Sequence, residues 1–516
     1  MLSNHYDLII VGFGPTGATL ANLMGQYGWN VAVIEQETEI YPHPRAVHGD
    51  DETLRIFQAI GLLDHIQPDL AFFTQMQLAS RIGKPILTIE VGKTTGDYGF
   101  GTDFWFHQPT LEQSLREGCK RFSTITTFLG WRAIKLTQTT EQVFLKIERE
   151  GTIQHLSATY LVGCDGTNSF VRKALTIDFE DLHFRQRWLV VDAYWEYEPP
   201  KNWQPIHQQI CDPQQPITFV PSTQQHYRWE FMLSDSTTSN DPVEISKSLL
   251  PLLALEKSVK IARRAIYTFE ARLAKQWNSK RIFLAGDAAH QTPPFLGQGM
   301  CAGIRDAHNL AWKLHFLLKG MQSSNLISSY QTERYPHVKK LIKGAIILGA
   351  IIQTQQPMIA SIRNLILRIL SKLPALVKLI QNQIVKKEKL RNGFFGGNHP
   401  SLAGSLFIQP QVQDGQQGLV LLDELLGHEF ALLCFQPLPR YALQNLGDNF
   451  PMRILNIDFE HDLGQQIHDY QQQLGKWFRK HHVDFVILRP DRHIYDAGTI
   501  AAFPSVLQSF SKPFNL

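Results

Sequence analysis

The chain of 516 residues is too long for one compact core, so we expect two or three domains. Apolar residues make up 43% and charged residues 19%, close to the average of folded globular proteins, which argues against disorder. Lysine and arginine total 50 against 47 acidic residues, and the resulting net charge of +3 is too balanced to indicate a nucleic-acid partner.

The five cysteines lie far apart and form no CxxC pair, so the sequence predicts no metal site and no dithiol redox centre. Scattered thiols in odd number are typical of a reducing compartment. The first six residues are polar and lead directly into an expected strand, which leaves no room for a signal peptide. The longest apolar run, Ala345 to Ile352, is far shorter than a membrane span. We therefore expect a cytoplasmic protein with no membrane span.

A β-α-β unit opens the chain. Asp7 to Val11 has the pattern of a buried parallel strand, Thr16 to Gly28 that of a helix, and Asn30 to Ile34 that of a second strand. The turn after the first strand reads Gly12-Phe13-Gly14-Pro15-Thr16-Gly17. In such a turn the first glycine permits the sharp bend, the second lets a pyrophosphate approach the backbone, and the third lets helix and strand pack closely. This spacing predicts a dinucleotide site.

Glu35 ends the second strand, where a carboxylate meets the ribose hydroxyls of a bound dinucleotide. An acid at this position repels a 2′-phosphate, so the adenosine bound here is not that of NADP. The turn and Glu35 by themselves do not distinguish NAD from FAD.

Trp188 to Leu233 alternates apolar and polar residues, as in a mixed or antiparallel sheet, and Leu326 to Leu390 is mainly helical. The segment Met358 to Lys389 is apolar with interspersed lysine and arginine. It is either a membrane-surface helix or a set of helices that cover the core, and base rates favour the second.

After a glycine-rich linker at residues 392–397, a last α/β module is expected. Its strands are predicted at Phe430 to Phe435, Met452 to Ile457 and Asp484 to Leu488, with a helix from Gln465 to His481.

A second motif decides the cofactor. An apolar strand from Arg281 to Ala285 delivers Gly286 and Asp287 to its carboxyl end, and a helix begins near Gly299. A carboxylate there can accept hydrogen bonds from a ribityl chain, and the positive end of the helix favours negative charge on a reduced flavin. The alternative is a purely structural strand–turn–helix. A plain NAD dehydrogenase does not need this second site, so FAD is favoured.

A third motif, from Gly163 to Arg172, again closes a strand with Asp-Gly and enters a helix. Its Asp165 either contributes to the cofactor site or simply caps the helix.

Together, in this order and at these separations, the three motifs resemble those of the class A flavoprotein monooxygenases. The resemblance extends to Pro44-Arg45-Ala46 and to residues 50–55 beside the flavin, and to Gln108 as a flavin-contacting glutamine. It implies that the first turn binds the ADP part of FAD, that the Asp165 motif lies near FAD and NAD(P)H, and that Asp287 holds the ribityl chain.

Several segments resemble the 3-(3-hydroxyphenyl)propionate hydroxylase branch in particular. They are residues 211–213, 228–231, 303–307, 406–410 and 489–492. Two positions depart from the family: Cys301 stands where an asparagine is usual, and His48 where a small residue is frequent. His48 either reaches the flavin or substrate or is a solvated histidine.

The resemblance implies an α/β fold with three parts. A Rossmann-like FAD-binding domain of the glutathione-reductase type is interleaved with a mixed β-sheet substrate domain, and a thioredoxin-like domain without CxxC follows. The expected FAD-binding segments are 1–75, 105–180 and 276–395, the substrate segments 76–104 and 181–275, and the thioredoxin-like domain 400–516. The candidate cofactor-binding residues are Gly12, Gly14, Pro15, Thr16, Gly17, Glu35, Gln36, Arg45, Gln108, Asp165, Gly286, Asp287, Pro294, Gly297, Gly299 and Met300.

The implied chemistry is hydroxylation of a small phenolic substrate with O2 and with NADH or NADPH as co-substrate, through a flavin C4a-hydroperoxide. A phenol becomes a good nucleophile only when its proton is drawn away, and His48 and His226 are the candidates for this role. Arg228 either binds a substrate carboxylate or pairs with Glu230 or solvent.

Three alternatives accompany this interpretation. A flavin monooxygenase of a larger polyketide or antibiotic shares the same motifs. A non-catalytic FAD-binding protein is the alternative from another class, and a homo-oligomer is compatible with either. A flavin halogenase is disfavoured because its Trp-x-Trp-x-Ile-Pro signature is absent.

Overall fold

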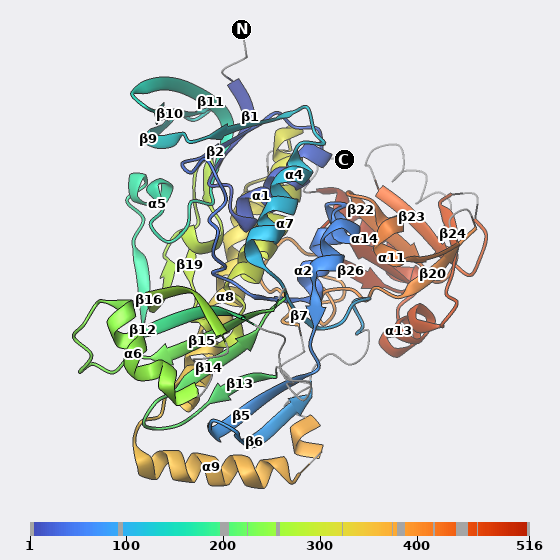
Figure 1. Cartoon of the computed structure of the whole chain (residues 1–516). Helices are drawn as coiled ribbons and strands as arrows, with labels where there is room; N and C mark the ends of the chain where they lie inside the picture. The colour runs from blue at the N-terminus through green and yellow to red at the C-terminus, as the bar shows by residue number, and fades with distance from the viewer. Residues whose placement is uncertain are drawn as a thin grey trace.

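The computed structural model describes residues 5–90, 96–196, 206–223, 225–253, 259–321, 323–373, 375–378, 387–415, 418–439, 452–461 and 463–512. Figure 1 shows three regions: a first sheet with its long helices, a second sheet below it, and a C-terminal α/β module to one side.

The first sheet holds the β-α-β unit predicted at the start of the chain. Strands β18, β11, β1, β2 and β8 run parallel, so their carboxyl ends lie at one edge, where ligands bind in open α/β sheets. The strands in order are β17 (Asn278–Ser279), β18 (Ile282–Leu284), β11 (Thr152–Gly163), β1 (His5–Val11), β2 (Val31–Glu35) and β8 (Ile125–Leu129), with β10 (Val143–Arg149) and β9 (Arg132–Gln138) extending from β11.

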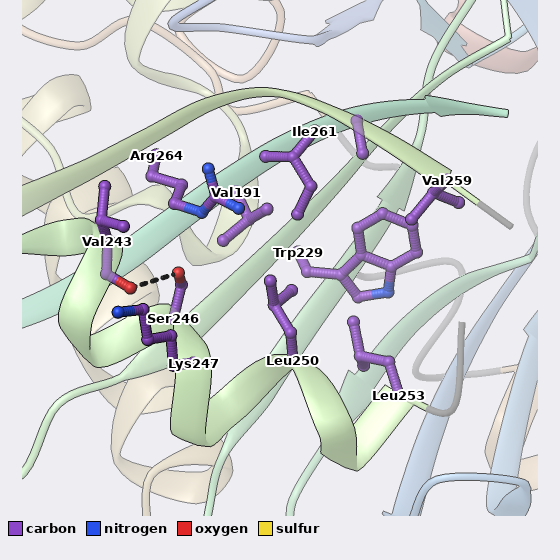
Figure 2. A pocket seen from close by; sticks show the side chains of 11 residues that line it. Val191, Trp229, Val243, Ser246, Lys247, Leu250, Leu253, Val259, Ile261 and Arg264 are labelled. Atoms are coloured by element: carbon purple, nitrogen blue, oxygen red, sulfur yellow. Dashed lines mark hydrogen bonds between the residues drawn. The ribbon is translucent and has the colours of Figure 1, made fainter. Parts of the chain in front are cut away.

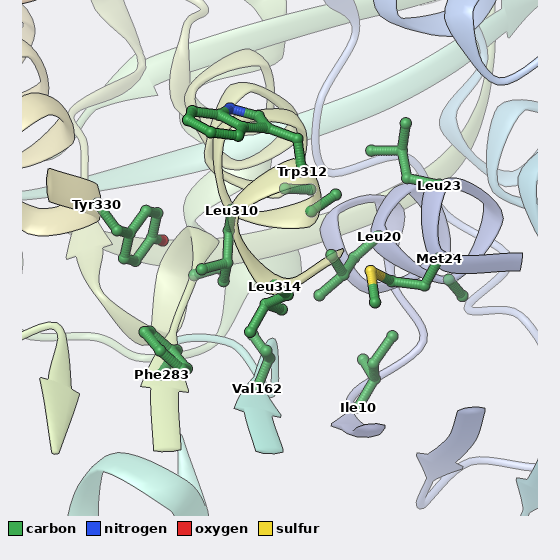
Figure 3. Packing of buried hydrophobic residues seen from close by; sticks show 14 of the residues in the cluster. Ile10, Leu20, Leu23, Met24, Val162, Phe283, Leu310, Trp312, Leu314 and Tyr330 are labelled. Carbon is green, nitrogen blue, oxygen red and sulfur yellow. The ribbon is translucent and has the colours of Figure 1, made fainter. Parts of the chain in front are cut away.

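Two helices, α1 (Pro15–Gln26) and α7 (Gly299–Leu318), pack on this sheet. Figure 3 shows Leu20 and Met24 of α1 facing Leu314 of α7, with Ile10 and Val162 of the strands below them. These side chains are almost completely buried. Removing this apolar surface from water fixes both helices against the strands whose turns form the site.

The second sheet is mixed: its strands are antiparallel except for the parallel pair of β13 and β5. In order they are β19 (His290–Gln291), β16 (Val259–Ala274), β12 (Phe179–Trp195), β15 (His226–Met232), β14 (Ile217–Pro221), β13 (His207–Ile210), β5 (Gln75–Arg81) and β6 (Lys84–Glu90). Tyr227, Trp229 and Phe231 belong to the apolar cluster on the side of α6 (Pro242–Leu249), so the alternating residues His226 and Arg228 face the other way.

Between the two large sheets lies a three-stranded sheet of β3 (His48–Asp50), β7 (Asp103–Trp105) and β4 (Ala71–Phe72). Helix α2 (Asp51–Ala59) follows β3 directly, and α3 (Leu63–Ile66) and α4 (Gln108–Cys119) contact each other nearby. Helix α5 (Phe170–Ala174) contacts β9 and β11 of the first sheet.

The helical region consists of α8 (Ser324–Ile352) and α9 (Pro357–Ser371) within the described residues. No single described helix is long and apolar enough to cross a membrane; α8 and α9 reach that composition only as a pair, bent by 108°. The favoured interpretation, that this region covers the core, holds for one face of α9, where Ala360 and Arg363 are buried and Leu367 packs on the apolar cluster of the second sheet. Most of the other apolar residues of α9 point outward, which the sequence did not predict.

The C-terminal module has a seven-stranded sheet with α11 (Leu422–Leu426), α13 (Gln473–His481) and α14 (Phe503–Ser511). Its strands in order are β21 (Gly418–Leu421), β20 (Gln411–Asp414), β24 (Gln465–His468), β23 (Met452–Ile457), β22 (Phe430–Cys434), β25 (Phe485–Leu488) and β26 (Ile494–Gly498).

One predicted element of this module is wrong in its first half. Residues 465–468 form strand β24, parallel to β23, and only the second half of the expected helix from Gln465 to His481 is helical. The boundary is set by Asp469, whose carboxylate accepts the backbone N–H groups of Gln473 and Gly475 at the start of α13.

Buried ion pairs join this module to the helices of the first region. Arg489 donates to Glu333 of α8 at 2.9 Å and also pairs with Asp491, which accepts from Asn309 of α7 at 3.0 Å. The resemblance noted for residues 489–492 therefore corresponds to a docking contact between domains.

Candidate active site

Three turns meet at the carboxyl edge of the first sheet. A Cβ built on Gly17 would lie 2.0 Å from the carbonyl oxygen of Gly12, so the first turn closes only with glycine there. Gly12 has φ +100°, and a Cβ on it would lie 2.4 Å from the carbonyl oxygen of Cys164 and 2.9 Å from Cα of Asp165. The first turn therefore packs directly on the Asp165 turn.

Thr16 joins the third turn to the other two. A Cβ on Gly286 would lie 2.7 Å from the Thr16 hydroxyl oxygen, and one on Gly303 of α7 would lie 2.3 Å from it. The three motifs, which span nearly 300 residues of sequence, are thus brought into contact by glycines that have no room for a side chain.

Gly14 behaves differently from its neighbours. A Cβ on Gly14 would meet no atom within 4 Å, and Gly14 precedes α1 without a side-chain hydrogen bond to the free N–H groups of the helix. Open space in front of unpaired helix N–H groups suits a pyrophosphate. Glu35 stands at the end of β2, where one oxygen accepts the Phe13 N–H at 2.8 Å. The residues present fit the ADP part of FAD.

The carboxylate of Asp165 serves its own helix. It accepts the backbone N–H of Val171 at 2.9 Å and the hydroxyl of Ser169, both at the start of α5. Asp165 therefore supports the start of α5, whose N-cap is Ser169, and a contact of its side chain with the cofactor stays a prediction.

Asp287 is accessible at the third turn, although the protein surrounding it raises the pKa of its carboxyl group. The turn is anchored from below by Asp306 of α7, which accepts the Gly286 N–H at 3.1 Å and pairs with His290 and Arg334. Burial opposes ionisation of Asp306, but its interactions with His290 and Arg334 outweigh burial and lower its pKa. Asp306 was not predicted as a site residue, although it lies within residues 303–307, which resemble the hydroxylase branch.

The Pro44-Arg45-Ala46 loop is held from two sides. The side-chain oxygen of Gln108 accepts the N–H groups of Arg45 and Ala46 at 2.8 and 2.7 Å. The guanidinium of Arg228 donates to the carbonyl oxygens of Arg45, at 2.9 Å, and Pro44. Gln108 was expected to contact the flavin; here its oxygen positions the loop.

Arg228 and His226 form a buried cluster with Asp192 of β12. The Asp192 carboxylate accepts from Arg228 at 2.8 Å and from His226 at 3.0 Å. Burial opposes ionisation of Asp192, but the hydrogen bond from His226 and the charge of Arg228 lower its pKa to about 2. The expectation that Arg228 pairs with Glu230 or solvent is corrected: Arg228 and His226 are both buried against Asp192.

His48 is the one proposed catalytic residue that lies beside the flavin-site turns. Its Nε2 is 2.8 Å from Asp103, and its Nδ1 faces the carbonyl oxygen of Gly297 at 3.4 Å. Burial disfavours protonation of the ring, but the hydrogen bond and charge of Asp103 outweigh it and raise the pKa of His48. Cys301 lies below, its thiol 3.8 Å from the His48 carbonyl oxygen, and burial raises the thiol pKa to about 12.

Aromatic rings complete the surroundings of His48. Phe73 and Trp105 stack with centroids 4.1 Å apart, and both present an edge to the His48 ring. His207 lies next to Trp105, and burial lowers its pKa to about 3, so its ring is neutral. Asp103, Phe73, Trp105 and His207 were all missed, because nothing in the sequence pairs β3 with β7 or brings β13 to them.

The remaining candidates surround the same edge. Pro294 begins the short turn that ends at Gly297 in the left-handed conformation, and Gly299 and Met300 begin α7, half-buried. Gln36 is exposed after β2.

Residues 5–345 match the FAD binding domain family, and residues 404–513 match the HcaD C-terminal domain family. A 3-(3-hydroxy-phenyl)propionate/3-hydroxycinnamic acid hydroxylase of Mycolicibacterium gilvum (strain PYR-GCK) is 31% identical over 99% of this chain and 92% of the relative. The chain belongs to the class A FAD-dependent monooxygenases.

Solved structures show the same fold. The monooxygenase matches PieE, solved with FAD and substrate, with a TM-score of 0.84 and 18% identity over 99% of both chains. It matches aklavinone-11 hydroxylase, solved with FAD and aklavinone, with a TM-score of 0.80 and 18% identity over 99% of both chains. The family and fold confirm the expected FAD-binding domain, mixed-sheet domain and C-terminal domain.

A separate cavity of the monooxygenase, about 340 Å³ in volume, lies between the second sheet and α6. Figure 2 shows Trp229, Val191 and Leu250 lining it, with Arg264 at one side. Because Trp229 and Arg228 are adjacent on a strand, this cavity opens on the face opposite to the Arg45 loop and His48. It is not part of the flavin edge.

No group of three or more His, Cys, Asp or Glu residues is arranged to hold a metal ion in the described part of the chain.

Proposed function

We propose that this monooxygenase hydroxylates the ring of a small phenolic acid, 3-(3-hydroxyphenyl)propionate or a close analogue, with O2 and NAD(P)H. The proposal is supported by the M. gilvum relative, which carries that substrate in its name and aligns with nearly the whole chain. The single observation that carries it is the His48–Asp103 pair. This pair lies beside the Gly297 turn, and the rings of Phe73 and Trp105 contact His48.

FAD, when bound, accepts the hydride of NAD(P)H and supplies the activated oxygen. The chain supplies position and proton transfer. We assign the His48 imidazole as the group that accepts the phenolic proton, because Asp103 at Nε2 and the Gly297 carbonyl oxygen at Nδ1 both stabilise the protonated ring. The carboxylate of Asp103 then stabilises the imidazolium, and a deprotonated phenol is the stronger nucleophile toward oxygen.

The rings of Phe73 and Trp105 fit a flat aromatic substrate. A stacked pair beside His48 offers an apolar wall that orients a phenyl ring and excludes water. Neutral His207, hydrogen-bonded to Gln209, adds no charge to that wall. Arg228 and His226 act in this scheme as positioning residues. Arg228 donates to the carbonyl oxygens of Pro44 and Arg45 and so holds the loop, and Asp192 accepts hydrogen bonds from both Arg228 and His226.

The experiment is NAD(P)H oxidation by the purified holoenzyme with 3-(3-hydroxyphenyl)propionate, 3-hydroxycinnamate and larger polyketide phenols. We expect the small acids to stimulate oxidation of NADH or NADPH and to yield a product that is one oxygen atom heavier. Oxidation that yields only hydrogen peroxide with the small acids, or hydroxylation of the polyketides alone, would refute the proposal.

We further propose the domain division 1–75, 105–180 and 276–395 for FAD binding, 76–104 and 181–275 for substrate, and 400–516 for the C-terminal domain. It is supported by the strands of the first sheet, which all fall inside the FAD segments. Strand β19, at residues 290–291, departs from it by joining the second sheet. We also propose a cytoplasmic location, because all five cysteines are free thiols.

A further inference from the structure

Helix α9 exposes an unusually apolar surface. Of the large apolar side chains that are exposed in the described residues, nearly half lie between Ile347 and Leu373. Met358 is 75% exposed, Leu365 58% and Ile362 54%. Figure 1 places α9 at the lower edge of the molecule, away from the first sheet and the C-terminal module. Contiguous exposed apolar surface of this kind marks an interaction site.

The exposed residues share one face of the helix. They are Met358, Ile359, Ile362, Leu365, Ile366 and Ile369, with Leu373 just beyond the helix end. Their spacing of three, four and seven residues forms a stripe along α9. Burial within this chain therefore cannot explain the amphipathic pattern.

The orientation of α9 is fixed by its opposite face. Arg363 is buried and donates to the carbonyl oxygens of Ile351, at 2.9 Å, and Cys211. Ala360 is buried beside it, and Leu367 packs on the apolar cluster of the second sheet. Turning the apolar stripe inward would break the hydrogen bonds from a buried guanidinium to these two carbonyl oxygens, which is costly.

The charged side chains within the α8–α9 segment have one sign. Between Glu333 and Glu388 the sequence contains no aspartate or glutamate. The basic side chains exposed in the described part of this segment include Lys343, Arg368, Lys372 and Lys378. An apolar stripe on a segment that carries cations and no acid is complementary to an apolar layer with an anionic surface.

We propose that α9, with the adjoining end of α8, docks on an anionic lipid surface with α9 lying in the plane of the interface. The 108° bend between α8 and α9 turns α9 across the end of α8 and suits this in-plane position. A second copy of the chain is a poorer occupant, because a two-fold contact through α9 would bring the same cations together with no acid in the segment to pair with them.

The test is flotation of the full-length holoenzyme with vesicles of phosphatidylcholine alone and of phosphatidylcholine with phosphatidylglycerol. We expect flotation with the anionic vesicles, reduced by added salt. The variant Ile362→Ser/Leu365→Ser/Ile366→Ser changes only exposed side chains, so it should fold and retain flavin, and its partition onto anionic vesicles should fall at least about tenfold.

The matched control is Phe144→Ser/Ile153→Ser/Leu419→Ser, which removes apolar side chains of similar exposure elsewhere and should leave flotation unchanged. The variant Arg368→Gln/Lys372→Gln should weaken binding to anionic vesicles only. The proposal is overturned if the wild type does not float with either composition, if the first and control variants float equally, or if light scattering finds a dimer that the first variant abolishes.

Discussion

The two halves of the active site are built from different parts of the polypeptide. The flavin half consists of backbone turns, in which a side chain on Gly12, Gly17 or Gly286 would come within 2.4, 2.0 and 2.7 Å of another group. The substrate half consists of side chains, chiefly His48, Asp103 and the rings around them, which three separate strands bring together. Substitutions among the side chains of the substrate half leave the glycine turns of the flavin half unchanged. A site of this construction can therefore keep its cofactor chemistry while the residues that contact the substrate change.

The strongest test of this contrast exchanges glycines within the first turn. Gly17→Ala places a methyl group 2.0 Å from the Gly12 carbonyl, so we expect loss of about 1–3 kcal/mol of stability together with loss of flavin. Gly14→Ala meets no protein atom within 4 Å, so the fold should survive while FAD affinity falls. Thermal unfolding and flavin content of both purified variants separate the effects; equal stability of the two would break the comparison.

A second large effect is expected where the halves meet, at the Asp192 cluster. Arg228→Met leaves a buried carboxylate with fewer partners and should lower the free energy of unfolding by about 3–5 kcal/mol in denaturant titrations. Because the pKa of Asp192 is depressed to about 2, its contribution is present above its unfolded pKa and is lost as pH falls toward 2. The double variant Arg228→Met/Asp192→Asn should recover part of the loss; an unchanged single variant would contradict the assigned positioning role.

In the substrate half, His48→Ala should spare the fold and the flavin but reduce kcat for hydroxylation by about 10²–10⁴. Uncoupled oxidation should rise, so peroxide per NAD(P)H consumed is the sharper readout. His65→Ala, which changes an exposed histidine of α3, is the matched control. Full coupling in His48→Ala would remove this residue from the mechanism.

The smallest expected effect is a shift of the pH profile. His48 must be neutral to accept a proton, so kcat/KM should rise with pH through its pKa. The hydrogen bond and charge of Asp103 raise that pKa against the effect of burial, so Asp103→Asn should move the acidic limb to lower pH. If the acidic limb of the pH profile does not move in Asp103→Asn, a group other than His48 controls it.

The same contrast explains what the sequence can predict. The glycine turns, Glu35 and Asp287 are recognisable because each depends on a few consecutive residues whose backbone geometry is dictated locally. Strand alternation indicates that Arg228 points away from the aromatic residues of its strand, but it cannot show that Asp192, 36 residues away, binds both Arg228 and His226. His48 could be singled out only as a departure, because its partner Asp103 reaches it through the pairing of β3 with β7.

The features that the sequence did not predict have a related physical cause. Residues 465–468 continue a polar amphipathic pattern into α13, and only the parallel pairing with β23 makes them a strand. The apolar stripe of α9 has a period that usually signals burial, yet the contacts of Arg363 turn it outward. Both outcomes depend on long-range contacts that periodicity does not contain.

The most direct test is a structure of the holoenzyme with 3-(3-hydroxyphenyl)propionate bound. We expect the phenolic oxygen within hydrogen-bond distance of the His48 ring, with the substrate ring against Phe73 and Trp105. A substrate bound instead in the cavity beside Trp229 under α6, or without any contact to His48, would contradict the account.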